Sequence, residues 1–298
     1  MTPKVVSSLE IVSTRQIKSL FALTKPRLVL MVLVTVCAGF YLASQEDTIN
    51  WISLIHLLLG TALAAGGSLA LNQYMERDID GMMGRTQSRP LPGRQLSPTE
   101  ALLFGITITA FGQLYLIFTV NILASAVIFI VIFIYLLVYT PLKKRDPIST
   151  FFGSISGALP PVAGWVAVTG QINRESCVLF GILFLWQLPH SLALAWMYRH
   201  EYAKAGVRLL PVAHPNGKST AFHIVFHSSL LLLVASFPKF IGLAGWFYFT
   251  SALVCGLVLL AFSIIFALSR TTVAARQLMH ISLLYLPIVF LVMVIDKA

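Results

Sequence analysis

Three oxygen-bearing side chains, Asn72, Glu76 and Asp80, recur at intervals of four residues where a long apolar stretch ends. At about 100° per residue, these positions fall within roughly an 80° arc of one helix face. Oxygen ligands suit a hard cation such as magnesium, which usually keeps several waters and shares phosphate oxygens. The spacing alone leaves a second explanation open, in which a solvated helix end simply extends its charged groups into water.

Basic residues crowd the same part of the sequence. Arg85, Arg89 and Arg94 follow the three oxygen-bearing residues, and the basic run 143–145 is expected on the same side of the protein. Carboxylates beside many cations favour a metal together with a polyanion, most simply a diphosphate. Membrane topology alone also demands positive charge in such loops, so the pattern does not single out one Arg or Lys.

A second polar cluster lies within a later apolar stretch. Residues 186–190 read Trp-Gln-Leu-Pro-His, and Arg199 and Glu201 follow them. Polar side chains inside a membrane span usually face the interior of the bundle, so His190 is a candidate for binding substrate or metal. The alternative is that His190 only bonds a neighbouring helix.

These clusters must be positioned by membrane helices, because the composition excludes an ordinary soluble protein. Hydrophobic residues make up 57% of the 298 residues and charged residues only 11%, whereas soluble domains carry about 25% charged residues. A span needs about 20 apolar residues, and nine stretches qualify: 28–44, 51–75, 99–119, 122–139, 150–169, 177–198, 220–237, 244–268 and 277–295. We therefore predict an all-α integral membrane protein, with nine transmembrane helices bundled around a central cavity and one domain over 1–298.

The basic residues favour nine spans over the alternative of eight, in which one kinked helix crosses the weak junction at 119–122. With the N-terminal segment 1–27 in the cytoplasm, 18 of the 21 basic residues fall in cytoplasmic segments, as the positive-inside rule requires. Eight spans would divide the basic loops between the two sides. This one-sided distribution also explains the net charge of +10 without a nucleic-acid partner.

Taken in order, the motifs resemble the UbiA-type membrane prenyltransferase superfamily, and within it the branch that farnesylates haem. Asn72, Glu76 and Asp80 match the pattern N-x-x-x-D-x-x-x-D, with Glu in place of the usual first Asp. The second acidic motif keeps only Glu201. Further matches are residues 23–27 (LTKPR), 85–91, 139–145 (YTPLKKR), 157–161 (GALPP), 186–190 (WQLPH) and 201–212.

This resemblance implies farnesyl diphosphate and haem B as substrates, haem O and diphosphate as products, and Mg²⁺ as cofactor. It implies that Asn72, Glu76 and Asp80 bind the metal and that Glu201 contributes to the site. The implied diphosphate ligands are Arg77, Arg85, Lys143, Lys144 and Arg199. The implied catalytic set is Asn72, Glu76, Asp80, Arg77, Lys143 and His190, with His190 also binding haem iron, because neutral imidazole is a common iron ligand.

Two other functions stay open. A UbiA-type enzyme with an aromatic acid acceptor would carry the same metal motif. A secondary transporter is disfavoured, because its charged residues would lie at the membrane midplane rather than at one face. The implied partners are the lipid bilayer and a haem A-forming enzyme or oxidase assembly factors. A bacterial cytoplasmic membrane is expected, since the N-terminal segment contains Glu10 and few arginines and so makes a poor mitochondrial transit peptide.

Overall fold

The computed structural model describes residues 14, 16–45 and 49–298, so Lys4 and Arg15 of the predicted N-terminal segment lie outside the described residues. The elements are α2 (Pro26–Ala43), α3 (Trp51–Gly81), α4 (Pro98–Thr119), α5 (Ile122–Phe133), the π-helical turn η2 (Ile134–Tyr139), α6 (Thr140–Leu142), α7 (Ser149–Ala158), α8 (Pro160–Thr169), α9 (Arg174–Met197), α10 (Arg199–Lys204), α11 (Leu210–Ala213), α12 (Lys218–Val234), α13 (Phe237–Phe240), α14 (Trp246–Ser269) and α15 (Thr272–Ile295).

Nine helical stretches in the described part of the chain are long and apolar enough to cross a membrane. Three of them are composite: Ile122–Leu142 joins α5, η2 and α6, Ser149–Thr169 joins α7 and α8, and Lys218–Phe240 joins α12 and α13. The predicted all-α fold with nine transmembrane helices is therefore confirmed.

Asn121 separates the two spans whose junction was the weakest in the sequence. Its side-chain oxygen accepts a hydrogen bond from the Ala124 amide at 2.7 Å and thereby caps α5. Its side-chain nitrogen donates to the carbonyls of Val166 and Ala167 at 3.1 and 3.2 Å. One amide group thus starts a new helix and attaches it to α8, so the chain turns here instead of continuing as one long helix.

The second span is longer than its apolar stretch. The predicted apolar stretch ends near residue 75, and the ridge requires the helix to reach Asp80; α3 does so, since it continues to Gly81 and has 31 residues. At 1.5 Å per residue this is about 46 Å, against a hydrocarbon thickness of about 30 Å. The extra turns carry Glu76 and Asp80 beyond the apolar part of the helix without a break in the backbone.

The fifth span is interrupted between Ala158 and Pro160, where the sequence predicts one continuous stretch. Pro160 and Pro161 have no backbone N–H, so the helix cannot continue through them with its hydrogen bonds intact. The second half, α8, then packs against α2 through glycines. A Cβ on Gly39 would lie 2.1 Å from the Pro161 carbonyl oxygen, and one on Gly164 would lie 2.0 Å from that of Val36.

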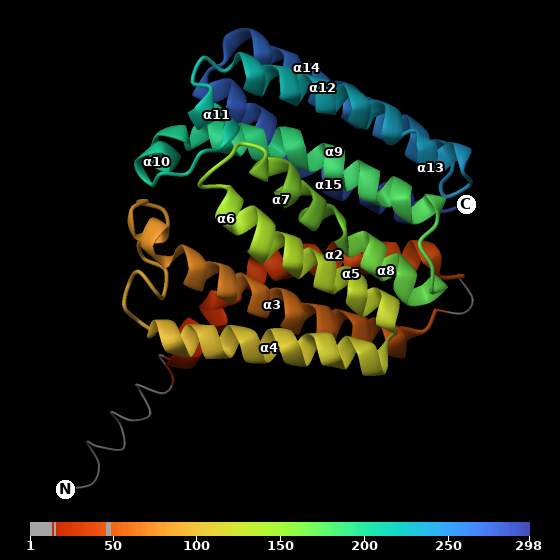
Figure 1. Cartoon of the computed structure of the whole chain (residues 1–298). Helices are drawn as coiled ribbons and strands as arrows, with labels where there is room; N and C mark the ends of the chain where they lie inside the picture. Colours follow the sequence, from red (N-terminus) through yellow and green to blue (C-terminus); the bar gives the residue numbers. More distant parts are fainter. Residues whose placement is uncertain (1–13, 15, 46–48) are drawn as a thin grey trace, which may run out of the picture.

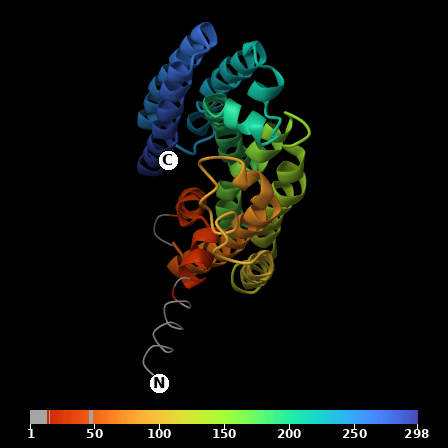
Figure 2. The ribbon, with the colours of Figure 1, turned by 90° about the vertical axis from the view of Figure 1, so that its left-hand side faces the viewer.

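The buried apolar side chains form two large clusters. One lies mainly between α9, α12, α14 and α15, and the other lies mainly between α2, α3, α5 and α8. Figure 2 shows the C-terminal helices on one side of the molecule and the N-terminal helices on the other. Large apolar side chains on the outer helix faces, such as Phe247, Leu253 and Leu257 of α14, are exposed. Such a surface is stable against lipid rather than water.

Three predicted cytoplasmic loops meet at one end of the bundle, at the left in Figure 1. The Arg208 amide donates to the Lys143 carbonyl at 2.8 Å. Ile79 and Met83, from the end of α3 and the loop after it, pack against Ala205 and Val207 from the segment after α10. The end of α3 is therefore enclosed by protein from the loops after α3, α6 and α9.

The contact between α2 and α8 generates a stability prediction. Gly164→Ala places a methyl group against the Val36 carbonyl, which belongs to a helix backbone and cannot move aside. We expect a loss of about 1–3 kcal/mol of stability, measured as a lower midpoint of thermal unfolding in detergent. Gly81→Ala is the matched control, because its nearest neighbour would be 4.0 Å away. Equal midpoints for the two variants would contradict the close contact.

Candidate active site

The polar ridge formed by Asn72, Glu76 and Asp80 lies on the last turns of α3, and all three side chains are buried. Asn72 and Glu76 are in direct contact, because the Asn72 side-chain nitrogen donates to Glu76 Oε1 at 2.8 Å. The spacing of four residues does place them one above another on a single helix face. The structure places all three residues on the last turns of one helix, as their spacing predicts, and their roles as site residues stay predictions.

Each carboxylate of the ridge is paired with a cation through one of its two oxygens. Lys143 forms an ion pair with Glu76 Oε1. Arg89 binds Asp80 Oδ2 at 2.6 Å. Burying a carboxylate without a partner is very costly, so these cations are what allows the two acids to be buried. Among the described residues, the second oxygen of each carboxylate makes no hydrogen bond.

The amide of Asn72 is held in one orientation by Thr140. The Thr140 hydroxyl donates to the Tyr135 carbonyl at 2.8 Å, so it can only accept from the Asn72 side-chain nitrogen at 3.0 Å. Tyr135 is five residues before Thr140, which is the spacing of the π-helical turn η2. Both N–H groups of the Asn72 amide are therefore used, and its oxygen faces the remaining space, where Lys25 approaches at 3.4 Å.

These oxygens fit a hard divalent cation. The free oxygens of Glu76 and Asp80 and the Asn72 amide oxygen are the ligand types that Mg²⁺ prefers, and Mg²⁺ usually keeps several waters as well. In the described part of the chain, no group of three or more His, Cys, Asp and Glu side chains converges as a metal site. Two carboxylates and one amide therefore leave coordination positions open for water or phosphate oxygens.

Lys25 lies next to the ridge although it comes from the other end of the sequence. It precedes α2 and adopts a left-handed backbone conformation, with φ of 48°. Burial is the main cause that lowers the pKa of Lys25 to about 8; the nearby Arg89 guanidinium also lowers it, and Glu76 and Asp80 raise it. Three cations, Lys25, Arg89 and Lys143, thus lie around two ridge carboxylates. An anion placed there would balance the excess of positive charge.

A cavity of about 260 Å³ opens beside the ridge. Its walls are Met75, Glu76, Thr140, Pro141, Lys144 and Arg145. The cavity thus brings together one ridge carboxylate and two cations of the predicted basic run 143–145. A space of this size and lining has room for a small anion such as a diphosphate group.

The other predicted diphosphate ligands lie around the ridge rather than on it. Arg85 donates to the Tyr202 hydroxyl at 2.7 Å and lies over the rings of Tyr198 and Tyr202. It therefore connects the loop after α3 to α10 above the ridge end of the bundle. Arg199 contacts a residue three positions before it in the chain. Its guanidinium donates to the Trp196 carbonyl at 2.9 Å and lies over the Trp196 ring.

Arg77 and Glu201 are not brought into contact with the ridge. The Arg77 guanidinium donates to the Tyr74 carbonyl at 2.9 Å and lies 3.9 Å from Asp78. Glu201 lies on α10, and its Oε2 is buried without a hydrogen-bond partner. The roles of these two residues stay predictions.

His190 lies on α9 and is attached to α15. Its Nδ1 atom is 2.8 Å from the Ser282 hydroxyl, and its ring stacks on Trp186 with centroids 5.1 Å apart. The Trp186 indole donates to the Ser282 carbonyl at 2.7 Å. His190 is thus bonded to a neighbouring helix through Nδ1, as one of the two predicted alternatives states. Its Nε2 atom makes no hydrogen bond among the described residues.

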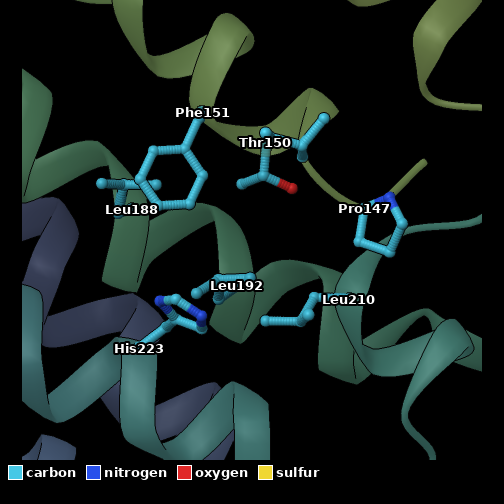
Figure 3. A pocket seen from close by; sticks show the side chains of 8 residues that line it. Pro147, Thr150, Phe151, Leu188, Leu192, Leu210 and His223 are labelled. Carbon is cyan, nitrogen blue, oxygen red and sulfur yellow. The ribbon is translucent and has the colours of Figure 1, made fainter.

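An apolar pocket of about 200 Å³ lies elsewhere, between α7, α9, α11 and α12. Figure 3 shows the Phe151 ring and the His223 imidazole reaching into it from two different helices. Leu188 and Leu192 of α9 also line it. This pocket shares no lining residue with the cavity beside the ridge.

Three residues of the site were missed as site residues by sequence reasoning: Lys25, Arg89 and Thr140. Lys25 and Thr140 stand inside the quoted motifs LTKPR and YTPLKKR, and Arg89 stands in the segment 85–91. Membership of a motif was therefore the available signal. The contacts themselves could not be predicted from the sequence. Asn72 and Thr140, for example, are 68 residues apart and meet only because their helices pack together.

The chain matches the UbiA prenyltransferase family over residues 32–286, and it belongs to that family. The resemblance noted in the sequence is confirmed. With nine apolar spans in its described part, it is a multi-pass membrane protein.

Two relatives align with this chain over nearly their whole length. A protoheme IX farnesyltransferase of Solibacter usitatus (strain Ellin6076) is 40% identical over 284 residues, which cover 92% of this chain and 97% of the relative. A protoheme IX farnesyltransferase of Aquifex aeolicus (strain VF5) is 37% identical over 285 residues, which cover 94% and 95%.

Solved structures share the fold at low sequence identity. A digeranylgeranylglyceryl phosphate synthase aligns with a TM-score of 0.81 at 18% identity, over 94% of this chain and 98% of its own. A UbiA homolog from Archaeoglobus fulgidus, bound to GPP and Mg²⁺, aligns with a TM-score of 0.64 at 18% identity, over 92% and 99%. The bundle is thus a shared architecture of this family.

The orientation of the Asn72 amide generates a prediction about cation binding. Thr140→Val keeps the shape of the side chain but removes the acceptor for the Asn72 amide, which is then free to turn its oxygen away. We expect about tenfold weaker binding of Mn²⁺, used as a probe for Mg²⁺ and measured by EPR titration of the purified protein. Thr140→Ser should bind as the parent does. Unchanged affinity in Thr140→Val would contradict the orienting contact.

Proposed function

We propose that this protein transfers the farnesyl group of farnesyl diphosphate to a vinyl group of haem B, with addition of water, to give haem O and diphosphate. The observation that carries the proposal is the polar ridge with its surrounding cations at the water-facing end of a membrane bundle. The farnesyltransferase names of the relatives, which align over nearly their whole length, support the choice of substrates.

Glu76 and Asp80 would hold magnesium through their free oxygens, and Asn72 would hold it through its amide oxygen, which now contacts Lys25. When bound, magnesium supplies positive charge against the diphosphate. The solved UbiA homolog from Archaeoglobus fulgidus is bound to GPP and Mg²⁺. Glu201, whose Oε2 is buried without a partner, is the next candidate for the metal or its waters. These assignments rest on the chemistry of the oxygens and on their orientation.

Lys143 and Lys144 would bind the diphosphate, because one pairs with the ridge and the other lines the cavity beside it. Arg85 would close over it from the loop, and Arg77 and Arg199 would need to turn from their present partners to reach it. Negative charge gathers on the leaving diphosphate as the allylic C–O bond breaks. Cations fixed in advance stabilise that charge in the transition state more than in the ground state.

The bond changes balance without a redox partner. The haem vinyl group supplies the electron pair that forms the new carbon–carbon bond, and the diphosphate leaves with the electrons of the C–O bond. Water adds to the resulting cation and loses a proton, which leaves a hydroxyethylfarnesyl group. His190 would hold the haem iron. The Tyr139 ring, which stacks on Tyr135 and lies under Lys143 in this structure, would have to expose a face to stabilise the allylic cation.

We further propose that the protein resides in a bacterial cytoplasmic membrane, because the relatives from Solibacter usitatus and Aquifex aeolicus are bacterial. Haem O made there would pass to a haem A-forming enzyme or to oxidase assembly factors. The second expectation follows from the proposed product.

A substitution in the ridge tests the metal assignment. Asp80→Ala removes one buried carboxylate, and we expect at least about a hundredfold loss of turnover in inserted, folded protein. Asp78→Ala is the matched control: it lies two residues away on the same helix, but its side chain is 81% exposed whereas that of Asp80 is 1% exposed. Turnover is measured as diphosphate released. Normal turnover by Asp80→Ala would end the assignment.

A single-turnover assay tests the acceptor. Purified protein is mixed with haem B, farnesyl diphosphate and magnesium, and the extracted haem is weighed by mass spectrometry. We expect a gain of one farnesyl group and one water. Unchanged haem with farnesyl on an added aromatic acid would keep the ridge and move the acceptor. Unchanged haem with no diphosphate released would refute the enzyme function.

A further inference from the structure

The hydrogen bonds around Ser282 determine which nitrogen of His190 carries a proton. Ser282 is fully buried on α15, and its hydroxyl has one hydrogen to donate. That hydrogen is used on the Met279 carbonyl at 2.7 Å. The contact of 2.8 Å with His190 can then only be a bond in which Nδ1–H donates and the serine oxygen accepts.

A neutral imidazole that donates from Nδ1 has its lone pair on Nε2. This lone pair is the one that an iron atom would need. The stacked Trp186 ring fixes the plane of the imidazole, and the Trp186 indole is itself bonded to the Ser282 carbonyl. His190 is partly buried, and its Nε2 has no hydrogen-bond partner among the described residues. One residue of α15 therefore controls the tautomer and the tilt of the ring.

We propose that Ser282 is a positioning residue, which presents the unprotonated Nε2 of His190 to the iron of the haem substrate. The proposal rests on the proposed function, since it takes haem as the molecule that His190 binds. Groups that bond the far nitrogen of an iron- or zinc-binding histidine orient it and raise its basicity, and their loss typically weakens metal binding by about 10- to 100-fold.

The test uses haem binding by the purified full-length protein in detergent, without farnesyl diphosphate. Ser282→Ala removes the acceptor but fits the same buried volume. We expect about tenfold weaker haem binding by absorbance titration. The iron–histidine stretching band of the ferrous complex, seen by resonance Raman spectroscopy, should shift to lower frequency, because the ring loses the bond that increases its electron density. A purely structural loss would not shift this band in the haem-bound fraction.

Ser263→Ala is the matched control. Ser263 is equally buried, donates to the Leu259 carbonyl at 2.8 Å and contacts the Ser228 hydroxyl at 2.8 Å, but it lies on α14 and does not contact His190. We expect its haem affinity and band position to equal those of the parent protein.

Three outcomes overturn the proposal in distinguishable ways. A parent-like band and affinity in Ser282→Ala, with haem binding lost in His190→Ala, would remove the role of Ser282 alone. Haem binding with an unchanged iron–histidine band in His190→Ala would show that another residue binds the iron, while haem remains the acceptor. Failure of the parent protein to bind haem at all would reject the proposed acceptor itself.

Discussion

The pairing of buried carboxylates with cations from the loops that follow α3 and α6 is the constraint on which this structure depends. Glu76 and Asp80 are buried at the end of α3, where a carboxylate without a partner would be prohibitively costly. Their partners are Lys143, the residue directly after α6, and Arg89, in the loop after α3. The loops at this end of the bundle must therefore fold inward over α3, and the helices must stand close enough for their termini to meet.

The helices approach one another closely where glycines, which have no side chain, lie at the contact. Gly39 and Gly164 let the backbones of α2 and α8 touch, and Gly157 lies against the Gln187 amide. Without water in the bilayer core, helices associate through such packing and through hydrogen bonds between them. The bonds of Asn121 to α8 and of His190 to α15 belong to the second kind. Both kinds determine where the site residues lie relative to one another.

Features that depend on local periodicity, such as spans and helix faces, can be predicted from the sequence. Contacts that depend on how distant helices pack cannot. Nine spans could be counted, because apolar length and the distribution of basic residues are properties of the chain itself. The ridge could be predicted for the same reason, since Asn72, Glu76 and Asp80 share a face by helix periodicity alone. The break at Pro160 could have been predicted from two consecutive prolines.

The partners of the ridge could not be predicted from the sequence. Several basic residues in the loops were equivalent candidates, and only the arrangement of the helices separates Lys143, which reaches Glu76, from Arg77, which turns to Tyr74. The left-handed conformation that brings Lys25 to Asn72 has no signal in its residue type.

The order in which the partners are synthesised has a consequence for membrane insertion. Lys25 is made before α3, and Arg89 follows Asp80 by nine residues, so both are at hand when α3 enters the bilayer. Thr140 and Lys143 follow only after α4 and α5, and Thr140 comes 68 residues after Asn72. During biogenesis the last turns of α3 must therefore stay hydrated at the aqueous side of the translocon until α4 and α5 have been synthesised. The last contacts of the ridge are thus made by Thr140 of α6 and by Lys143, and not within α3 itself.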